Sequence, residues 1–444
     1  MQVLRRSFAA IAVFAALPLF AQQSPFTWSA KLELRGNYRD SEHDRFVTGF
    51  IFPAQLIPPG GVHAVEETVD PGRHTELSVA QVKLDVSYSK WFLAHAQIHG
   101  QDKYRRNPTT HDKQIDADEL YIRIGDKPEF LERPDGTSFF AQFGKAPKME
   151  RQPLRLLESY GLAATAFNRF EDIQALVGGS IGRNFYWRVQ AANGNPVYLR
   201  DPNALAGDNG VRELKNSPPN PKLAAGFPII YNAETEGYFF DTDHVQWGEG
   251  LGYRWANADQ STGFDFIAFH YRRNLADKEK LTGSFYGGDI DLFNGPEGLP
   301  PGFAVSLPIT NRRKEETGAR LYAEWKGLTA IAQYTKQNVA GLHRSGYEFE
   351  SGYKIPIGRG PVQYFQPTLR VSGLQNTFRA AADKRFPAPS FWWPWTKIDY
   401  GFRAGLGHGL DITAEQTKQN IGSPVTKPVV REKETLVTLR LRLG

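Results

Sequence analysis

Apolar and polar residues alternate along many short segments of this chain. In the segment 28–34, every even position from Trp28 to Leu34 is apolar, and the positions between them are polar or charged. Successive side chains of a β-strand point to opposite faces of the sheet, so this period of two predicts a strand with one apolar and one polar face. The apolar face would meet either a protein core or lipid.

The same pattern recurs and predicts about 16 strands. They are expected near 28–38, 82–88, 92–98, 119–124, 139–143, 171–181, 184–193, 245–255, 263–272, 319–325, 328–334, 346–356, 362–374, 396–404, 409–419 and 437–443. Several reach nine or more residues. Strands of soluble proteins average about five or six residues, whereas strands that cross a membrane need about 9–11. The lengths therefore favour lipid as the partner of the apolar face.

The connections between these segments alternate in length. Short ones lie at 89–91, 182–183, 257–262, 327, 357–361 and 405–408, and long ones at roughly 40–75, 146–170, 194–243, 273–315 and 375–395. If the first strand begins at the periplasm and 284–293 is a loop, all the short connections fall at one end. Short periplasmic turns and long extracellular loops are typical of outer-membrane barrels. We therefore predict an all-β, transmembrane antiparallel β-barrel of about 16 strands. The long connection 126–136 leaves 18 as the alternative.

The first residues have the composition of an export signal. Arg5 and Arg6 precede an apolar run from Phe8 to Phe20, which Ala21 follows. This order is typical of a secretory signal peptide, and the run is too short for a spanning helix. We expect residues 1–21 to be the signal peptide and 22–444 to form one barrel domain. The chain contains no cysteine, which fits a bacterial cell outer membrane protein better than an animal secreted protein.

Neither charge nor motifs indicate nucleic-acid binding or catalysis. The formal charge of +5 falls to about +3 without Arg5 and Arg6, which is too balanced to favour nucleic acid. The G-x-S-x-G pattern at 178–182 lies before a second predicted strand, whereas a nucleophile elbow needs a helix there. His95 and His99 would be about 13 Å apart along a strand, too far for one metal ion. We expect no enzyme, no cofactor and no metal, although the Asp-rich segments 201–210 and 287–295 leave calcium as a weaker alternative to turn chemistry.

If the apolar faces meet lipid, the polar faces line the lumen. The basic positions on these faces are Lys31, Arg35, Lys83, Arg123, Arg188, Arg254, Arg320, Arg370, Arg403, Arg440 and Arg442. The acidic positions are Glu33, Asp85, Glu119, Glu324 and Asp399. An excess of basic side chains would favour anions, because charged side chains set the selectivity of pores. The alternative is cross-strand salt bridges with little net field.

The connection after residue 143 carries a further group of charged residues. In porin-type barrels the third long loop often folds inward and narrows the pore, so these residues would meet solute; an ordinary exposed loop is the alternative. The basic residues of this segment are Lys145, Lys148, Arg151 and Arg155, beside Glu150 and Glu158. The complete candidate set of pore-lining, anion-binding residues is Lys31, Arg35, Arg123, Lys145, Lys148, Arg151, Arg155, Arg188, Arg254, Arg320, Arg370, Arg403 and Arg440.

Three segments carry a resemblance to a known family. They are "FFAQFGKAPKMERQPLRLLESYG" (139–161), "FNRFEDIQALVGGSIGRNFYWRVQAANGNP" (167–196) and "ARLYAEWKGLTAIAQYTKQ" (319–337). Together they resemble the phosphate-selective porin O and P family. This resemblance implies a 16-stranded, trimeric barrel that passes small anions. The chain departs from the family in lacking a lysine-rich loop and in ending in Leu443-Gly444 rather than in an aromatic residue.

The expected function is that of an outer-membrane porin for passive diffusion of small anionic solutes. Its expected partners are outer-membrane lipid and lipopolysaccharide, the barrel assembly machinery, the solute and two further copies of the chain in a homotrimer. The opening "LELRGNYRDSEHDRF" (32–46) also resembles alginate-export-type barrels, so export of an acidic oligosaccharide or polysaccharide is the alternative. A barrel enzyme or adhesin built on the long loops is a third hypothesis.

Overall fold

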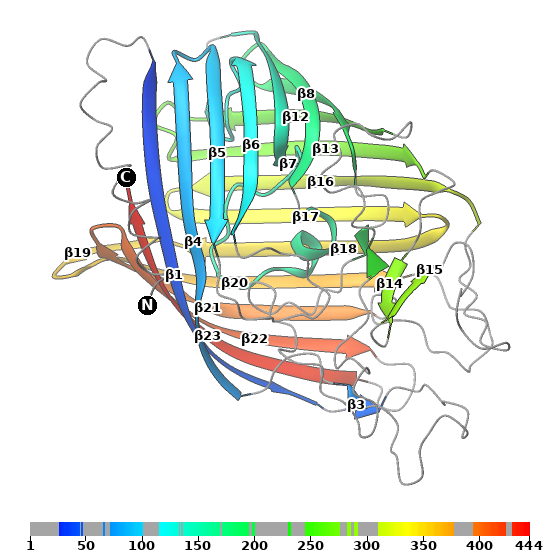
Figure 1. The fold of residues 1–444 in the computed structure, drawn as a ribbon. Coiled ribbons are helices and arrows are strands. Elements are labelled where there is room, and N and C mark those ends of the chain that lie inside the picture. The colour runs from blue at the N-terminus through cyan, green and yellow to red at the C-terminus, as the bar shows by residue number, and fades with distance from the viewer. Residues whose placement is uncertain are drawn as a thin grey trace, which may run out of the picture.

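The computed structural model shows one sheet that closes on itself (Figure 1). It describes residues 26–44, 46–47, 65–66, 72–100, 115–132, 134, 136–168, 171–194, 198–199, 230–231, 245–275, 282–285, 288–291, 310–376, 394–422 and 429–444. Strand β1 pairs with β4 along one edge and with β23 along the other, so the first and last strands complete the barrel. The signal peptide expected at residues 1–21 lies outside the described residues.

The barrel has 16 strands, as the alternation predicts. In order around the wall they are β1 (Thr27–His43), β4 (Gly72–Tyr88), β5 (Phe92–Gly100), β6 (Ile115–Gly125), β7 (Ser138–Pro147), β8 (Glu171–Ile181), β9 (Phe185–Ala192), β12 (Gln246–Ala256), β13 (Thr262–Asn274), β16 (Arg313–Trp325), β17 (Leu328–Val339), β18 (Leu342–Tyr353) continued by β19 (Ile355–Arg359), β20 (Val362–Asn376), β21 (Trp395–Gly407), β22 (Leu410–Gly422) and β23 (Val429–Leu443). β18 and β19 count as one strand because both pair with β20. Every neighbouring pair is antiparallel.

Six short strands belong to two smaller sheets outside the barrel wall. One sheet pairs β2 (Phe46–Val47) with β3 (Val65–Glu66), and the other contains β10 (Tyr198–Leu199), β11 (Ile230–Tyr231), β14 (Thr282–Phe285) and β15 (Gly288–Asp291). The ambiguous segment 284–293 therefore contributes to a small hairpin and not to the barrel. The connection 126–136, which left 18 strands as the alternative, contains no strand among its described residues, so the barrel has 16 strands.

The connections follow the predicted alternation, apart from the long connection between β6 and β7 at the end of the short turns and one short turn at the opposite end. The short turns that were predicted all join strands at the end where β1 begins and β23 ends. The short turn at the opposite end is the two-residue turn Ala340–Gly341 between β17 and β18, which lies at the end of the long loops. Both residues have positive φ angles, 57° and 98°. A two-residue hairpin with positive φ at both positions matches the twist of the flanking strands, so this loop needs no greater length.

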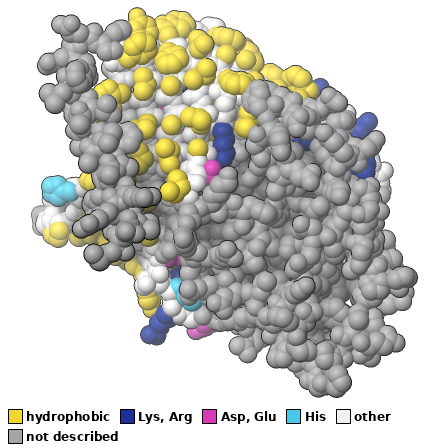
Figure 2. Space-filling view, viewed as in Figure 1, with side chains coloured by type: hydrophobic (Ala, Val, Ile, Leu, Met, Phe, Trp, Pro, Cys, Tyr) yellow, Lys and Arg dark blue, Asp and Glu magenta, His cyan; other side chains and the backbone are white. Residues whose placement is uncertain are grey.

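Apolar side chains cover the outer face of the barrel. On β12, Trp247 and Leu251 are 53% and 71% exposed, whereas the alternate Gln246 is buried. Figure 2 shows hydrophobic side chains gathered on the wall that carries β4, β5 and β6. The hydrocarbon core of a membrane favours an apolar surface and requires every backbone N–H and C=O group to be hydrogen-bonded within the protein. The outer face meets the first requirement, and the closed barrel meets the second because it leaves no edge strand unpaired. The fold is that of a transmembrane β-barrel.

Cysteine labelling gives a direct check of this orientation, since the natural chain has no cysteine. We expect Leu251→Cys, on the outer face, to react only with a membrane-soluble maleimide. Asp85→Cys, whose side chain faces the lumen and is 32% exposed, should react with a charged, water-soluble maleimide. Reversed labelling of the two variants in proteoliposomes would contradict the assignment of faces.

Candidate functional site

The loop between β7 and β8 folds into the barrel and contacts the opposite wall. We call residues 148–168 the constriction loop. The backbone N–H groups of Leu156 and Leu157 donate to one oxygen of Glu350 on β18, at 3.0 and 2.9 Å. The backbone N–H of Ser159 donates to Glu415 on β22, at 2.7 Å. Carboxylates of the wall thus accept hydrogen bonds from backbone N–H groups of the loop. A loop has no regular backbone pairing that would satisfy these groups.

Cationic side chains of the same wall hold the carbonyl groups of the constriction loop. Arg370 on β20 donates to the Ser159 carbonyl at 2.8 Å, and Arg344 on β18 donates to the Ala166 carbonyl at 2.9 Å. The last turn of the loop is π-helical (Ala164–Asn168). It lies in a buried apolar cluster formed by Leu162, Ala163, Ala166, Phe167, Leu374 and Trp395. The loop is therefore fixed by polar and apolar contacts together.

The wall beneath the loop holds a network of fully buried charges. Arg370 contacts Glu350 and Asp399, each at 3.2 Å, and Lys397 contacts Asp399 at 3.4 Å. All four side chains have no exposed surface. Buried ions are tolerated only when opposite charges and hydrogen bonds compensate them, and this network supplies both. Solvent does not reach these four side chains.

Several lumen-facing charged side chains of β1 and β4–β6 are partly exposed, whereas Arg39 on β1, Glu76 on β4 and Gln97 on β5 are buried. Asp85 is 32% exposed, Asp118 28%, Arg35 18% and Arg123 17%. These values contrast with the fully buried charges of the opposite wall. These exposures indicate a passage for solvent along part of the lumen face of β1 and β4–β6.

An arginine-rich group lies where the constriction loop meets this passage. Glu158 of the loop contacts Arg35 at 3.3 Å, Arg403 at 2.9 Å and also Arg440. We call the group the Glu158 cluster. Its members are Arg35, Arg155, Arg403, Arg440, Arg442, Glu33, Glu158 and Asp411. Five guanidinium groups thus share three carboxylates, which leaves an excess of positive charge.

The other strand residues of the candidate set lie apart from this cluster. Arg254 and Arg320 both contact Asp265, at 3.2 and 2.7 Å, and are almost fully buried. Arg123 contacts Glu129 at 3.3 Å. Arg188 lies over the rings of Phe140 and Tyr186, and Lys31 is exposed opposite Lys83 on the lumen face.

The cations of the constriction loop are also paired. Lys148 contacts Glu150 at 3.1 Å and Glu316, and its ammonium group lies 4.4 Å from the centre of the Tyr271 ring. Burial alone would lower the pKa of Lys148, but the two carboxylates outweigh this effect and raise it above its usual value. Arg151 pairs with Glu171. Arg155 stacks on Tyr160, with 3.7 Å between the guanidinium carbon and the ring centre.

Lys145 does not lie where the sequence prediction placed it. Strand β7 continues to Pro147, so Lys145 belongs to the strand and not to the loop. Its register partners are Leu120 on β6 and Ile173 on β8. Leu120 is 58% exposed on the outer face. Cross-strand partners share a face, so Lys145 points outward and leaves the set of pore-lining residues.

Sequence reasoning missed most of the acidic residues of the lumen. The buried carboxylates that it did not single out are Glu76, Asp265, Glu316, Glu348, Glu350, Asp411, Glu415, Glu432 and Glu434. They balance the basic residues, so the excess of basic side chains does not hold for the described part of the lumen. A signal was present: Glu348 and Glu350 alternate with the outward-facing Tyr347 and Phe349. Among the described residues, the Glu158 cluster keeps an excess of arginine, with five arginines to three carboxylates.

Two other features are absent from the described part of the chain. It contains no helix that is long and apolar enough to cross a membrane. Nor do its His, Asp and Glu side chains form a group of three or more that could hold a metal ion.

Comparison with solved structures identifies the fold, whereas comparisons of sequence find no match. No model of a protein family matches the chain. No curated protein matches it either. Among solved structures, the high-pH structure of OprB from Pseudomonas putida is similar to this chain, with a TM-score of 0.54 and 10% sequence identity. The similarity covers 94% of this chain and 94% of the OprB chain. The outer membrane channel DcaP of Acinetobacter baumannii has a TM-score of 0.53 at 8% identity, over 96% of this chain and 99% of the other. The chain has the fold of a bacterial outer-membrane β-barrel.

Proposed function

We propose that this chain is an outer-membrane porin that lets small solutes diffuse passively and prefers small anions. The observation that carries the proposal is the asymmetric lumen. A fixed constriction loop fills the side beneath β18–β22, and a partly exposed polar wall leaves a passage along β1 and β4–β6. Charged residues at a narrow passage set which ions pass.

The anion preference rests on the Glu158 cluster alone. Arg254, Arg320 and Arg370 pair with carboxylates of the wall, and such pairs leave little field to act on a solute. The cluster has two more arginines than carboxylates, and two of its members, Arg35 and Arg442, are 18% and 50% exposed. A small inorganic anion is the class of solute that this excess favours. Phosphate belongs to that class, and the sparse loop lysines give no reason to single it out.

The remaining expected partners belong to the same proposal. A porin of this kind would be inserted by the barrel assembly machinery, would contact outer-membrane lipid and lipopolysaccharide, and would form a homotrimer. Export of an acidic polysaccharide is not favoured, because the constriction loop crosses the lumen and is fixed to the far wall at Glu350 and Glu415.

Neutralising the two exposed arginines tests the anion preference. Arg35→Gln with Arg442→Gln leaves three arginines and three carboxylates in the cluster, so we expect the preference for chloride over potassium to disappear. The measurement is the reversal potential of reconstituted channels under a KCl gradient. Arg272→Gln, which changes an outward-facing arginine on β13, is the matched control and should behave as the wild type. Equal reversal potentials for the wild type and the double variant would refute the role of the cluster.

A further inference from the structure

The connection between β6 and β7 folds into the barrel at the end of the short turns. We call residues 126–136 the mouth segment. It starts beside the barrel wall, because the backbone N–H of Asp126 donates to the Phe139 carbonyl at 3.0 Å. Further along the segment, Pro128 is buried and Leu131 is only 9% exposed. A turn that projected into the periplasm would leave both side chains in water, so the mouth segment lies inside the barrel.

The mouth segment reaches strands that are distant from β6 and β7 around the wall. Leu131 lies in a buried apolar cluster with Ala256 on β12, Tyr322 on β16 and Ile331 on β17. These three partners face the lumen, close to the short-turn ends of their strands. Phe130 packs against the same cluster, with its ring centre 5.9 Å from that of Tyr322. The segment therefore passes over the lumen side of β8 and β9 to reach these strands.

Two buried arginines hold the mouth segment against this distant wall. Arg254 donates to the carbonyl groups of Pro128 and Glu132, at 3.0 and 3.3 Å. The guanidinium group of Arg320 lies 5.2 Å from the centre of the Phe130 ring, a cation–π contact. Both arginines also contact the same carboxylate of β13, which fixes their positions. These two members of the sequence-predicted set therefore hold a segment of the protein itself.

Ion pairs hold the mouth segment on the side where it leaves the wall. Glu129 contacts Arg123 on β6 and Lys127 of the segment, each at 3.3 Å. Asp126 contacts Lys90 of the neighbouring short turn at 3.4 Å. Glu129 is 42% exposed, so the segment borders solvent on this side. The mouth segment is thus attached to the wall on both sides of the barrel mouth.

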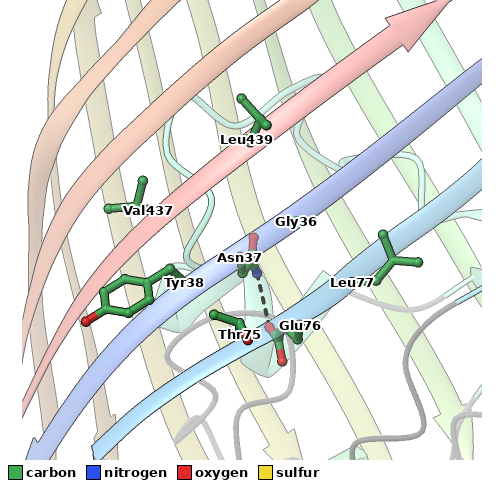
Figure 3. A pocket seen from close by; sticks show the side chains of 8 residues that line it. All are labelled: Gly36, Asn37, Tyr38, Thr75, Glu76, Leu77, Val437 and Leu439. Carbon is green, nitrogen blue, oxygen red and sulfur yellow. Dashed lines mark hydrogen bonds between the residues drawn. The ribbon is translucent and has the colours of Figure 1, made fainter.

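The wall at β1 and β4, which the mouth segment does not reach, is closed by side chains. The register of the two strands shifts between Arg35 and Gly36, and a groove lies on the outer face at Gly36. Figure 3 shows Asn37 and Glu76 turned to each other beneath the strands. The Asn37 amide donates to the Glu76 carboxylate at 3.2 Å. This pair separates the groove from the lumen.

We propose that the mouth segment is a second constriction, which limits the size of the solutes that pass the periplasmic end of the channel. The constriction loop lies against β18–β22 and enters from the end of the long loops. The mouth segment lies against the wall from β8 to β17 and enters from the opposite end. A solute that follows the partly exposed side of the lumen therefore passes the two segments in series. The inference rests on the proposed porin function and adds to it a size limit at a defined place.

Removal of the mouth segment from the full-length protein tests the proposal. Replacing residues 127–138 by Asn-Gly joins Asp126 to Phe139 through a two-residue turn, and these two residues are already hydrogen-bonded through their backbones. A graded series of polyethylene glycols is added to one side and then to the other side of a single channel in a planar bilayer, and entry of a polymer lowers the conductance. We expect this variant to admit larger polymers than the wild type from one side only. A variant in which two glycines replace residues 153–163 of the constriction loop should admit larger polymers from the opposite side.

A point variant tests the anchoring of the segment without a change in chain length. Leu131→Asp places a charge in the apolar cluster, which disfavours the inward position of the mouth segment. It should shift the size limit in the same direction and from the same side as the removal of the segment. Thr137→Ala, which changes an exposed side chain directly after the mouth segment, is the matched control and should admit the same polymers as the wild type. Heat-dependent migration on gels confirms that each variant is folded.

The same recordings separate the second constriction from the porin function. Unchanged polymer access from both sides, in a folded and conducting variant without the mouth segment, would overturn the second constriction. A change on the same side as that of the shortened constriction loop would also overturn it. Wild-type protein that carries no current would refute the porin function. In that case, current through the variant without the mouth segment would still support the constriction, and the absence of current would refute it too.

Discussion

Replacing Arg370 with methionine is expected to destabilise the barrel by about 3–5 kcal/mol, the typical cost of leaving buried charges without their partner. Arg370 contacts Glu350 and Asp399, and it also donates to the carbonyl of Ser159 in the constriction loop. Without the guanidinium group, two carboxylates remain buried with only Lys397 nearby. Urea unfolding in detergent micelles or liposomes, followed by tryptophan fluorescence, measures the effect.

The control for this variant is Arg272→Met, which removes an exposed arginine from the outer face of β13. Substitutions at exposed positions usually change stability by less than about 0.5 kcal/mol. An Arg370 variant that unfolds at the same urea concentration as the control would show that the buried network does not stabilise the barrel.

Shortening the constriction loop is expected to enlarge the channel. Replacing residues 153–163 by two glycines removes every contact of Leu156, Leu157 and Ser159 with the wall. The space that the loop fills then becomes part of the lumen, so single-channel conductance should rise by about twofold or more. The deletion removes Arg155 together with Glu158, so four arginines and two carboxylates remain in the cluster and the preference for anions should persist.

Leu154→Ala is the matched control for the shortened loop, because this side chain lies in the loop and is 38% exposed. It should conduct as the wild type. If the shortened variant and Leu154→Ala have the same conductance, the loop does not limit the passage, and the constriction must lie elsewhere in the chain.

The sequence predicts the barrel well because its signal is local and repeated. A period of two, read on segments such as 28–34 and 245–255, is enough to assign strands and their outer faces. The strand number followed from the alternation of short and long connections. The turn Ala340–Gly341 was missed because two residues with positive φ can replace a long loop without a change in the hydrophobic pattern.

The candidate site could be predicted only in part, because it depends on contacts between distant segments. The sequence left two alternatives for the segment after residue 143, a loop that folds into the pore and an ordinary exposed loop. The constriction loop follows the first of them. Its anchors do not follow from any local pattern: Glu158 meets Arg35, which is 123 positions away, and Arg403, which is 245 positions away. The acidic residues opposite the predicted arginines were missed where strand faces had not been assigned, as at Glu348 and Glu350. Lys145 was misplaced because β7 extends further than its apolar stripe indicated.

The central claim is that water and small ions pass between the constriction loop and the wall of β1 and β4–β6. Single-channel recording of the refolded wild-type protein in planar bilayers tests it most directly. The account predicts steady, open channels whose reversal potential in a KCl gradient favours chloride. Well-inserted protein that carries no current would contradict the claim, because the lumen would then be closed on both sides of the loop.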